Sequence, residues 1–271
     1  MAFVNASTGT PLLEVRDISL SFKGLVALEE VSFHVNQGEL FSIIGPNGAG
    51  KTSIFNCINQ VYRPQQGSIL WKGESLMGLK PNQTAERGIA RTFQNIELFA
   101  HMTVMDNILS GRHIRMSHGW VAGSLWMGRA KREEMENRFK VEDIIDFLEI
   151  ERWRKYPVGL LPYGVQKRVE LGRALAMDPE LLLLDEPVAG MNLEETEDMA
   201  RFILDIQDEL GISLILVEHD MSLVMDIADR VMVLDFGRKI AEGPPSEVQN
   251  NVDVIKAYLG TTGDPAMSEF G

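Results

Sequence analysis

The sequence predicts an α/β protein, because solid apolar runs alternate with helical stretches and one of these runs leads into a glycine-rich loop. The runs lie at residues 41–44, 181–184, 214–217 and 231–234. Strands without polar alternation are typical of a parallel sheet covered on both faces. Helical stretches between such strands favour an α/β fold over an all-β fold.

The first forty residues have a different strand pattern. Short β-rich runs at 12–15, 18–22 and 31–35 are separated by polar or turn residues. This alternation is typical of antiparallel strands with one exposed face. We therefore expect an N-terminal antiparallel β subdomain ahead of the parallel core.

The middle of the chain, residues 95–162, lacks strand-like runs. Its clearest pattern is the i, i+3, i+4, i+7 spacing of Val141, Ile144, Ile145 and Leu148. That spacing places one apolar stripe on a helix whose other face is charged. The segment is therefore predicted to be an inserted helical subdomain.

Composition excludes several classes of protein. The 271 residues include 39 acidic and 26 basic side chains, a net charge of −13, which argues against binding nucleic acid or anionic lipid by bulk electrostatics. The single cysteine, Cys57, excludes a disulfide framework or a multi-cysteine metal site, and we expect it to be a small buried residue. No apolar run approaches the roughly 18 residues needed to cross a membrane, and the N-terminus has no basic leader segment, so we expect neither secretion nor membrane spanning.

The most specific motif is a phosphate-binding loop. It fits G-x-x-x-x-G-K-S/T, follows the strand ending at Ile44 and precedes a helical run that begins at Ser53. Its residues are Gly45, Pro46, Asn47, Gly48, Ala49, Gly50, Lys51 and Thr52. The glycines let backbone N–H groups surround an anion, Lys51 reaches the β and γ phosphates, and the Thr52 hydroxyl binds Mg²⁺. A chain of this length matches the pattern by chance on the order of 1% of the time.

Two carboxylates end the strand of four leucines at residues 181–184. They are Asp185 and Glu186, and they follow a strand of the parallel sheet at the edge where such sheets bind ligands. Adjacent residues on a strand point to opposite faces, so the two acids have different roles. We predict that Asp185 belongs to the magnesium shell and that Glu186 polarises the attacking water.

A further strand ends in Glu218-His219-Asp220. A lone histidine is usually packed or on the surface, but this one follows the same sheet edge as the loop and the acids, so we predict that His219 contacts the γ-phosphate. Gln94 lies at the junction of the core and the helical insert, and by itself it indicates nothing.

Together these motifs resemble the nucleotide-binding subunit of an ATP-binding cassette (ABC) transporter, over nearly the whole chain. Residues 45–52 are similar to Walker A, Gln94 to the Q-loop, 181–186 to Walker B with its general base, His219 to the switch histidine and Phe22 to the aromatic that stacks on adenine. The resemblance implies a P-loop, RecA-like core at 12–95 and 176–245, a helical subdomain at 96–175 and a C-terminal tail at 246–271, in one nucleotide-binding domain. It also implies that Gln94 helps to bind Mg²⁺.

The family's Leu-Ser-Gly-Gly-Gln signature corresponds to residues 161–165, which implies that Tyr163 and Gly164 contact nucleotide. Pro162 replaces the serine that contacts the γ-phosphate, and Val165 replaces the glutamine. A charged hydrogen bond is worth roughly 1.5 to 3 kcal/mol, so we expect a weakened site on the ATP of the facing subunit. Asn192 replaces the usual aspartate in the turn after Walker B.

The subtype resembles ATPase subunits of branched-chain amino-acid importers, a likeness shared with urea, amide and aromatic-acid importers. It rests on Tyr163, the turn at 189–192, the insert at 119–128 and the tail at 253–260. The resemblance implies ATP and Mg²⁺ as cofactors, permease subunits and a second cassette as partners, an indirect solute-binding protein, and a peripheral position on the cytoplasmic membrane face. A soluble non-transport ABC ATPase and a largely non-hydrolysing nucleotide-binding module are the alternatives.

The resemblance also requires a surface that receives the permease. Leu98, Phe99 and Met102, just after Gln94, are the candidates. Ordinary core of the helical insert is an equally good interpretation of three apolar residues in a short window.

Overall fold

The computed structural model describes residues 11–92, 97–114 and 127–259 of the chain. These residues belong to two compact units. Unit 1 combines Met1–Lys80 with His219–Gly271, and unit 2 is Pro81–Glu218. Each unit is described by itself.

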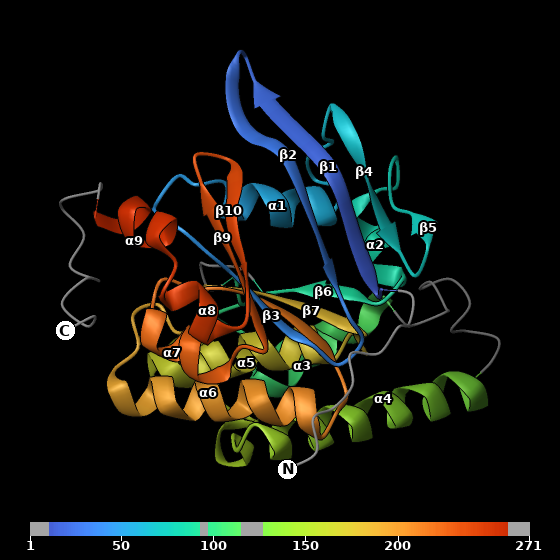
Figure 1. Ribbon diagram of the computed structural model, residues 1–271. Helices are drawn as coiled ribbons and strands as arrows, with labels where there is room; N and C mark the ends of the chain where they lie inside the picture. Colours follow the sequence, from blue (N-terminus) through green and yellow to red (C-terminus); the bar gives the residue numbers. More distant parts are fainter. Residues whose placement is uncertain (1–10, 93–96, 115–126, 260–271) are drawn as a thin grey trace, which may run out of the picture. The chain divides into compact units, whose positions relative to one another are not determined.

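Unit 1 contains an antiparallel sheet of strand order β2-β1-β4-β5 (Figure 1). Its strands are β1 (Leu13–Phe22), β2 (Leu25–Val35), β4 (Gln66–Trp71) and β5 (Glu74–Ser75). The antiparallel subdomain expected from the sequence is therefore confirmed.

The strand boundaries expected in this sheet were wrong at two places. The runs at 12–15 and 18–22 belong to one strand, because the polar residues between them form a bulge. Asp17 has a φ of 47° there, its N–H donates to Ser32 Oγ at 2.7 Å, and the register shifts between Val15 and Ile18. The run at 31–35 is the second half of β2, whose exposed first residues lack the expected alternation.

The remaining strands of unit 1 form its parallel part. Strand β3 (Leu40–Ile44) pairs in parallel with β9 (Arg230–Asp235), and β9 pairs antiparallel with β10 (Arg238–Gly243). Helix α1 (Lys51–Ile58) buries Ile54, Phe55, Cys57 and Ile58. The unit also contains α7 (Met221–Ile227), α8 (Pro245–Gln249) and α9 (Val252–Leu259).

Unit 2 has its own parallel strands, in the order β8-β7-β6. They are β6 (Ile89–Arg91), β7 (Leu181–Asp185) and β8 (Ser213–Val217). The solid apolar runs therefore do form parallel strands, β3 and β9 in unit 1 and β7 and β8 in unit 2. Helix α6 (Leu193–Asp208) buries one face, made of Met199, Phe202, Ile203 and Ile206.

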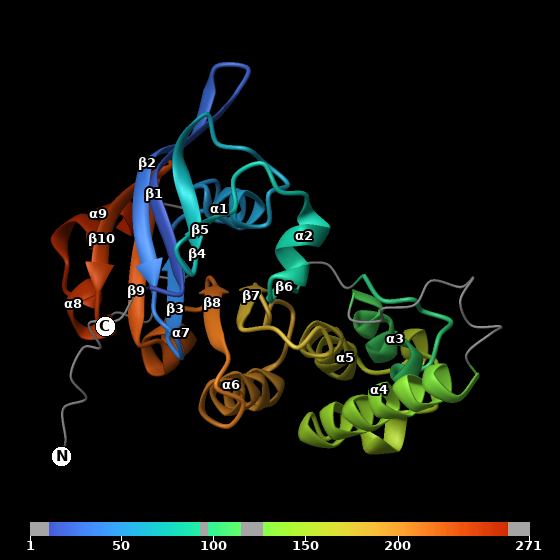
Figure 2. The same cartoon turned by 90° about the vertical axis from the view of Figure 1, so that its right-hand side faces the viewer.

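The rest of unit 2 is helical, as the sequence predicts for this part of the chain. Figure 2 shows α3 (Val104–Gly111), α4 (Met127–Phe147) and α5 (Tyr163–Leu175) grouped beyond the strands of this unit, and a short helix, α2 (Pro81–Glu86), precedes β6. Helices α3 and α5 approach so closely that a Cβ on Gly111 would lie 2.2 Å from the Arg173 carbonyl oxygen. Val141, Ile145 and Leu148 of the predicted stripe are fully buried.

None of the described helices is long and apolar enough to cross a membrane.

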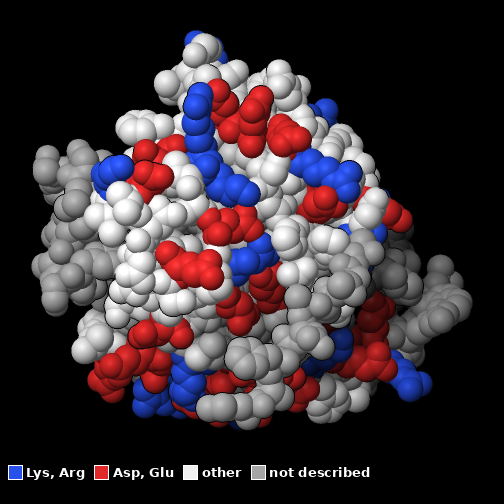
Figure 3. Space-filling model, in the orientation of Figure 1, with Lys and Arg blue, Asp and Glu red and all other residues white. Residues whose placement is uncertain are grey.

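On the face drawn in Figure 3, acidic and basic side chains lie interspersed. Nine of the 39 acidic residues fall between positions 192 and 220, where Arg201 is the only basic residue. Much of the negative charge therefore belongs to α6 and to the chain around β8.

Candidate functional site

The phosphate-binding loop lies in unit 1, between the end of β3 at Ile44 and the start of α1 at Lys51. Gly45, Gly48 and Gly50 have φ values of 148°, 82° and 107°, a region that other residues rarely adopt. A Cβ on Gly45 would lie 2.1 Å from the Leu234 carbonyl oxygen, and a Cβ on Gly50 would lie 2.7 Å from that of Ala27. Close packing against neighbouring backbone therefore demands glycine at both positions.

Lys51 brings a positive charge into this loop. The residue is only 5% exposed, and its Nζ donates to the carbonyl oxygens of Gly45 at 2.6 Å and Pro46 at 3.2 Å. Thr52, next on α1, is exposed and Ser53 is half-buried. A buried cation within a ring of glycines, at a helix N-terminus, suits the phosphates of a nucleotide.

The turn between β9 and β10 is hydrogen-bonded to the phosphate-binding loop. Gly237 donates its N–H to the Ala49 carbonyl at 2.9 Å, and its own carbonyl accepts from the Glu29 N–H at 2.8 Å. A hydrogen-bonded backbone therefore links β2, the turn and the phosphate-binding loop inside one unit. This support comes from residues about 190 positions later in the chain, and no local sequence pattern indicates it.

Phe22, the predicted adenine-stacking residue, ends β1 and is 43% exposed. Its ring meets the Tyr62 ring edge-to-face, with centroids 5.0 Å apart and planes inclined by 72°. This contact holds the Phe22 ring while leaving much of its surface open, which suits stacking on a base. Sequence reasoning missed Tyr62 because only the tertiary structure brings it to Phe22.

The two acids after the leucine strand lie in unit 2 and have different surroundings, as the alternation of side chains predicts. Asp185 is buried, and its Oδ2 accepts from Arg91 Nη2 at 2.6 Å. Glu186 is half-buried, and its backbone has a φ of 49° while its N–H donates to the Val217 carbonyl at 2.8 Å. A left-handed backbone at a non-glycine residue stores strain, which is common at catalytic positions.

The end of β8 adds a residue that sequence reasoning passed over. Glu218 is 3% exposed, and its carboxylate accepts from the Val188 N–H at 3.0 Å, inside unit 2. It therefore holds the turn that follows Glu186. The signal that could have found Glu218 is its position as an acidic residue directly after an apolar strand. Unit 1 resumes at His219, directly after Glu218. His219 is exposed, so it is not a packed core histidine.

The signature-like segment begins α5 in unit 2. Pro162 is the N-cap residue of α5 and provides no side-chain cap. The Tyr163 hydroxyl donates to the Ala189 carbonyl at 3.0 Å, and burial, followed by the Glu170 charge, raises the pKa of Tyr163. A Cβ on Gly164 would lie 2.5 Å from Glu195 Oε1. The signature-like segment is thus joined to the turn at 189–192 and to the first turn of α6.

Asn192 occupies the end of that turn. Its side chain accepts from the Glu195 N–H at 3.0 Å, and Glu195 accepts from the Asn192 N–H at 3.1 Å, a reciprocal cap on α6. Aspartate is an equally good cap in this position. The replacement of the family's aspartate therefore leaves the helix start intact.

Some predicted features lie outside the described residues. These are Gln94, most of the insert at 119–128 and Gly260 of the tail. The structure has Thr92 on one side of Gln94 and Glu97 on the other.

Comparison with known proteins decides the family. A family model described as ABC transporter matches residues 28–189, more than half of the chain. The chain belongs to the ABC transporter family of ATP-binding proteins. As a member of this family it is an ATPase. A second model, described as branched-chain amino acid ATP-binding cassette transporter, matches residues 238–264.

Individual relatives of this ABC ATPase match over almost their whole length. The high-affinity branched-chain amino acid transport ATP-binding protein BraF of Pseudomonas aeruginosa is 38% identical over 250 residues, covering 92% of this chain and 98% of BraF. LivG of Salmonella typhimurium, with the same description, is 39% identical with the same coverage. Among solved structures, an ATP-binding cassette of an ABC transporter in its ADP conformation has a TM-score of 0.81 and 30% identity, covering 93% of this chain and 100% of that one. A nucleotide-free cassette has a TM-score of 0.80 and 29% identity, covering 92% and 99%.

The apolar residues after Gln94 are on the surface of this ABC ATPase. Phe99 is 57% exposed and Met102 39%, while Leu98 is intermediate. Buried Asn107 shapes the loop: its Oδ1 accepts from the Phe99 N–H at 2.8 Å, and its Nδ2 donates to the Phe99 carbonyl at 3.1 Å. Phe99 and Met102 are therefore exposed, and the core interpretation is wrong for them.

This ABC ATPase has side-chain oxygens of the kind that bind Mg²⁺. Among the described residues, no group of three or more His, Cys, Asp or Glu side chains is arranged so that it could hold a metal ion. Mg²⁺ in nucleotide sites takes one or two protein oxygens and fills its remaining positions with phosphates and water. The Thr52 hydroxyl and the Asp185 carboxylate are oxygen donors of the required kind.

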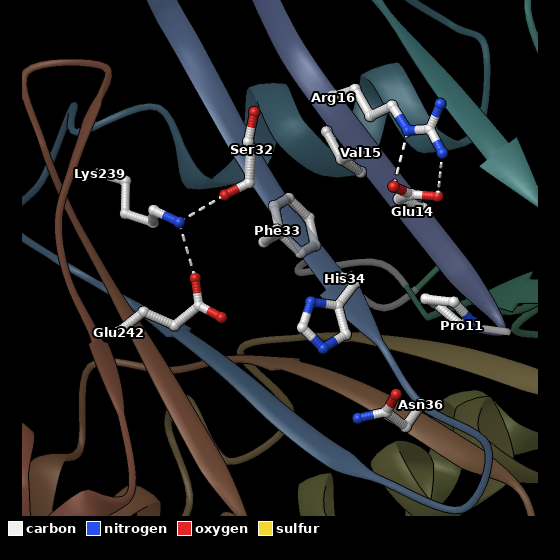
Figure 4. A pocket seen from close by; sticks show the side chains of 10 residues that line it. All are labelled: Pro11, Glu14, Val15, Arg16, Ser32, Phe33, His34, Asn36, Lys239 and Glu242. Carbon is white, nitrogen blue, oxygen red and sulfur yellow. Dashed lines mark hydrogen bonds and ion pairs between the residues drawn. The ribbon is translucent and has the colours of Figure 1, made fainter. Parts of the chain in front are cut away.

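A separate groove of about 620 Å³ lies on unit 1, between β1, β2 and β10 (Figure 4). None of the predicted site residues lines it. Its charges pair within the protein: Arg16 Nε donates to Glu14 Oε1 at 2.6 Å, and Lys239 Nζ donates to the Ser32 carbonyl at 2.6 Å and to Glu242 at 2.8 Å. The bond from Arg16 lowers the pKa of Glu14. These pairs leave the groove without an evident ligand, and we assign it no part in catalysis.

Proposed function

We propose that this chain is the ATP-hydrolysing subunit of an ABC importer that takes up branched-chain amino acids or related small polar solutes. The observation that carries the proposal is the 38% identity to BraF over 98% of its length, a relative whose name states branched-chain amino acid transport. The match of the branched-chain model to residues 238–264 supports the same subtype. It covers a segment separate from residues 28–189, which match the general ABC model, and so adds independent support.

In this proposal the whole chain serves as a single nucleotide-binding domain for Mg-ATP. Its core is 12–95 and 176–245, its helical subdomain with the signature is 96–175, and its tail is 246–271. The loop amides and Lys51 hold the phosphates, Ser53 continues their contacts on α1, and the Phe22 ring stacks on adenine. Support comes from the buried Lys51 cation and from the open Phe22 ring.

Thr52, Asp185 and Gln94 would hold Mg²⁺, which when bound neutralises charge on the phosphates. Glu186 accepts a proton from the attacking water. His219 and Gln94 contact the γ-phosphate. The strained backbone of Glu186 and the exposure of His219 support these assignments.

A second cassette completes the active unit. Tyr163 and Gly164 at the start of α5 are assigned to ATP held by the phosphate-binding loop of the facing cassette, with the α5 N-terminus directed at its γ-phosphate. A chain in which Pro162 replaces serine contributes one hydrogen-bond donor fewer to that ATP. The deficit therefore affects the facing site and not the site built on Lys51.

The cassette attaches to permease subunits at the cytoplasmic face of the membrane, and a solute-binding protein delivers the solute from the other side. Phe99 and Met102 form the proposed docking surface, because they are exposed apolar residues on a loop held by Asn107. Contact with a permease through apolar side chains persists at high salt, unlike electrostatic binding to lipid.

The test of turnover uses the purified protein and two variants. Glu186→Gln should lower ATP turnover by about 10² to 10⁴ and leave ATP binding largely intact, since it removes only the proton acceptor. Lys51→Ala should impair ATP binding itself. Wild-type protein that binds ATP but does not hydrolyse it, with or without permeases, would favour the non-hydrolysing alternative.

The test of transport uses cells that express the matching permeases and solute-binding protein. Uptake of labelled leucine should depend on this chain and disappear with Glu186→Gln. Phe99→Asp should abolish uptake while the purified variant keeps its fold and its basal ATPase activity. Uptake that persists without this chain would instead favour a soluble ABC ATPase unconnected to transport.

A further inference from the structure

We infer that Arg91 is a positioning residue for the magnesium site: it holds one oxygen of the Asp185 carboxylate so that the other is presented to the metal. The inference rests on the proposed function, because it assumes the magnesium role of Asp185. Arg91 belongs to none of the motifs identified in the sequence. Only the folded unit 2 brings it to the strand that carries the two acids.

The pairing of β6 with β7 brings the two side chains together. These strands are parallel, and Arg91 lies in register with Leu183. Side chains two residues apart on a strand share a face, so Asp185 lies on the face that Arg91 shares with Leu183. From there Arg91 Nη2 reaches Asp185 Oδ2 at 2.6 Å, and the two side chains are 11% and 3% exposed.

The next residue of the same strand end holds the main chain of Asp185. The Asp185 N–H donates to Thr92 Oγ1 at 3.3 Å, while the Thr92 N–H donates to the Leu183 carbonyl at 2.9 Å. Arg91 therefore holds the carboxylate and Thr92 the backbone. This double attachment limits the directions in which Asp185 can point.

Burial makes the arginine necessary. A carboxylate that follows four leucines and has almost no access to water needs a cationic or hydrogen-bonding partner. The Arg91 contact goes to Oδ2, which leaves Oδ1 for a metal ion. Partners that orient a metal ligand typically change metal affinity by about 10- to 100-fold when they are removed.

The inference differs from a purely structural role for the same ion pair. If Arg91 only joined β6 to β7, its loss would weaken folding and would lower nucleotide binding equally with and without metal. If Arg91 orients Asp185, its loss changes the Mg²⁺ concentration required and spares metal-free nucleotide binding. Metal dependence therefore separates the two roles.

The experiment measures binding of a fluorescent ATP analogue to the full chain carrying Glu186→Gln, in which hydrolysis is expected to be too slow to interfere. Mg²⁺ is titrated from EDTA, and the half-saturating concentration is compared with and without Arg91→Met. We expect it to rise by about 10- to 100-fold, while analogue binding in EDTA stays within about twofold. Arg91→Lys keeps the charge without the planar fork and should fall between the two.

Arg112→Met is the matched control. Arg112 is another buried arginine of unit 2, bonded to Asp178 and to the Ala176 carbonyl. Its loss should lower the thermal midpoint of unfolding and leave the half-saturating Mg²⁺ unchanged. If Arg91→Met does not fold, Arg91→Lys still tests the inference, with an expected rise of at least threefold.

An unchanged or lower half-saturating Mg²⁺ in the Arg91 variants overturns the inference, as does a parallel loss of binding in EDTA. Failure of the proposed function looks different. In that case the chain with unaltered Arg91 would not bind the analogue, or would bind it without any response to Mg²⁺.

Discussion

The Glu218 carboxylate accepts a hydrogen bond from the Val188 N–H at 3.0 Å, and so joins the end of β8 to the turn that follows Glu186. We expect Glu218→Ala to lower kcat by about 10-fold or more with little change in ATP affinity. The reason is that a buried N–H left without its acceptor costs roughly 1 to 3 kcal/mol, which the turn relieves by moving. Steady-state ATPase assays and equilibrium ATP binding check this.

Glu218→Gln is the control for that change. Its amide oxygen can still accept from Val188, so kcat should stay within about threefold of wild type. If the glutamine variant lost as much activity as the alanine variant, the charge of Glu218 and not its bond to the turn would be responsible.

Substitutions of Gly45 and Gly48 should destabilise the protein to different extents, although the two glycines share one loop. A Cβ at Gly45 would lie 2.1 Å from the Leu234 carbonyl oxygen, whereas a Cβ at Gly48 would meet nothing within 4 Å. Gly45→Ala should therefore destabilise the nucleotide-free protein by about 3 kcal/mol, at the upper end of the cost of overpacked cores. Gly48→Ala should cost only about 1 kcal/mol, from its positive φ.

Urea unfolding of both variants without nucleotide measures the difference. Equal free energies of unfolding would mean that the loop moves away from β9 and absorbs the Cβ. That result would remove the structural reason for glycine at position 45.

The strands and the phosphate-binding loop could be predicted from sequence because their signals are local. The four leucines of β7 and the valine-rich β9 show their burial directly in residue type. Strand β6 has only three residues, Ile89–Arg91, too few for any periodicity, and β10 mixes charged and apolar residues with only Gly243 buried. Asp17 resembled a break between strands because a bulge and a turn use the same residue types.

The partners of the site residues could not be predicted because they depend on distant contacts. Arg91 meets Asp185 across 94 positions of chain, and Tyr62 meets Phe22 across 40. Neither partner lies in a recognisable motif. Sequence reasoning thus selected candidate residues by their own chemistry, and the fold was needed to find the side chains that contact them.

Replacing Pro162 at the start of α5 by serine should raise ATPase activity. Pro162→Ser would restore a hydroxyl donor to the facing ATP, and a charged hydrogen bond of roughly 1.5 to 3 kcal/mol corresponds to about 10- to 100-fold. We expect ATPase activity of the assembled transporter to rise by up to that factor. Stability should change by less than about 1 kcal/mol, because serine adds an N-cap while the loss of proline frees the unfolded chain.

The comparison must use the assembled transporter, since the serine acts on ATP held by the other cassette. In a paired assembly with one copy of this chain, inactivating the phosphate-binding loop of the facing cassette should erase the gain. A gain that survived this change would mean that the serine acts within its own cassette.

Cys57, which is buried on α1, should make the free energy of unfolding depend on pH. Burial raises the pKa of the Cys57 thiol to about 12, so the folded protein keeps this proton where the unfolded chain, with an ordinary thiol pKa of about 8.5, releases it. The raised pKa makes this contribution to stability complete below about pH 8.5. It is then lost as pH rises toward 12, at up to about 1.4 kcal/mol per pH unit.

Two measurements check this prediction. A thiol reagent at pH 8 should leave native protein unlabelled and should label one site after unfolding in guanidinium. Between pH 9 and 11 the free energy of unfolding should fall more steeply for wild type than for Cys57→Ala, because only wild type releases the additional proton on unfolding. Lysines and tyrosines titrate in both proteins and cancel in the difference. Equal slopes would mean that the thiol already ionises in the folded state, and rapid native labelling would place Cys57 within reach of solvent.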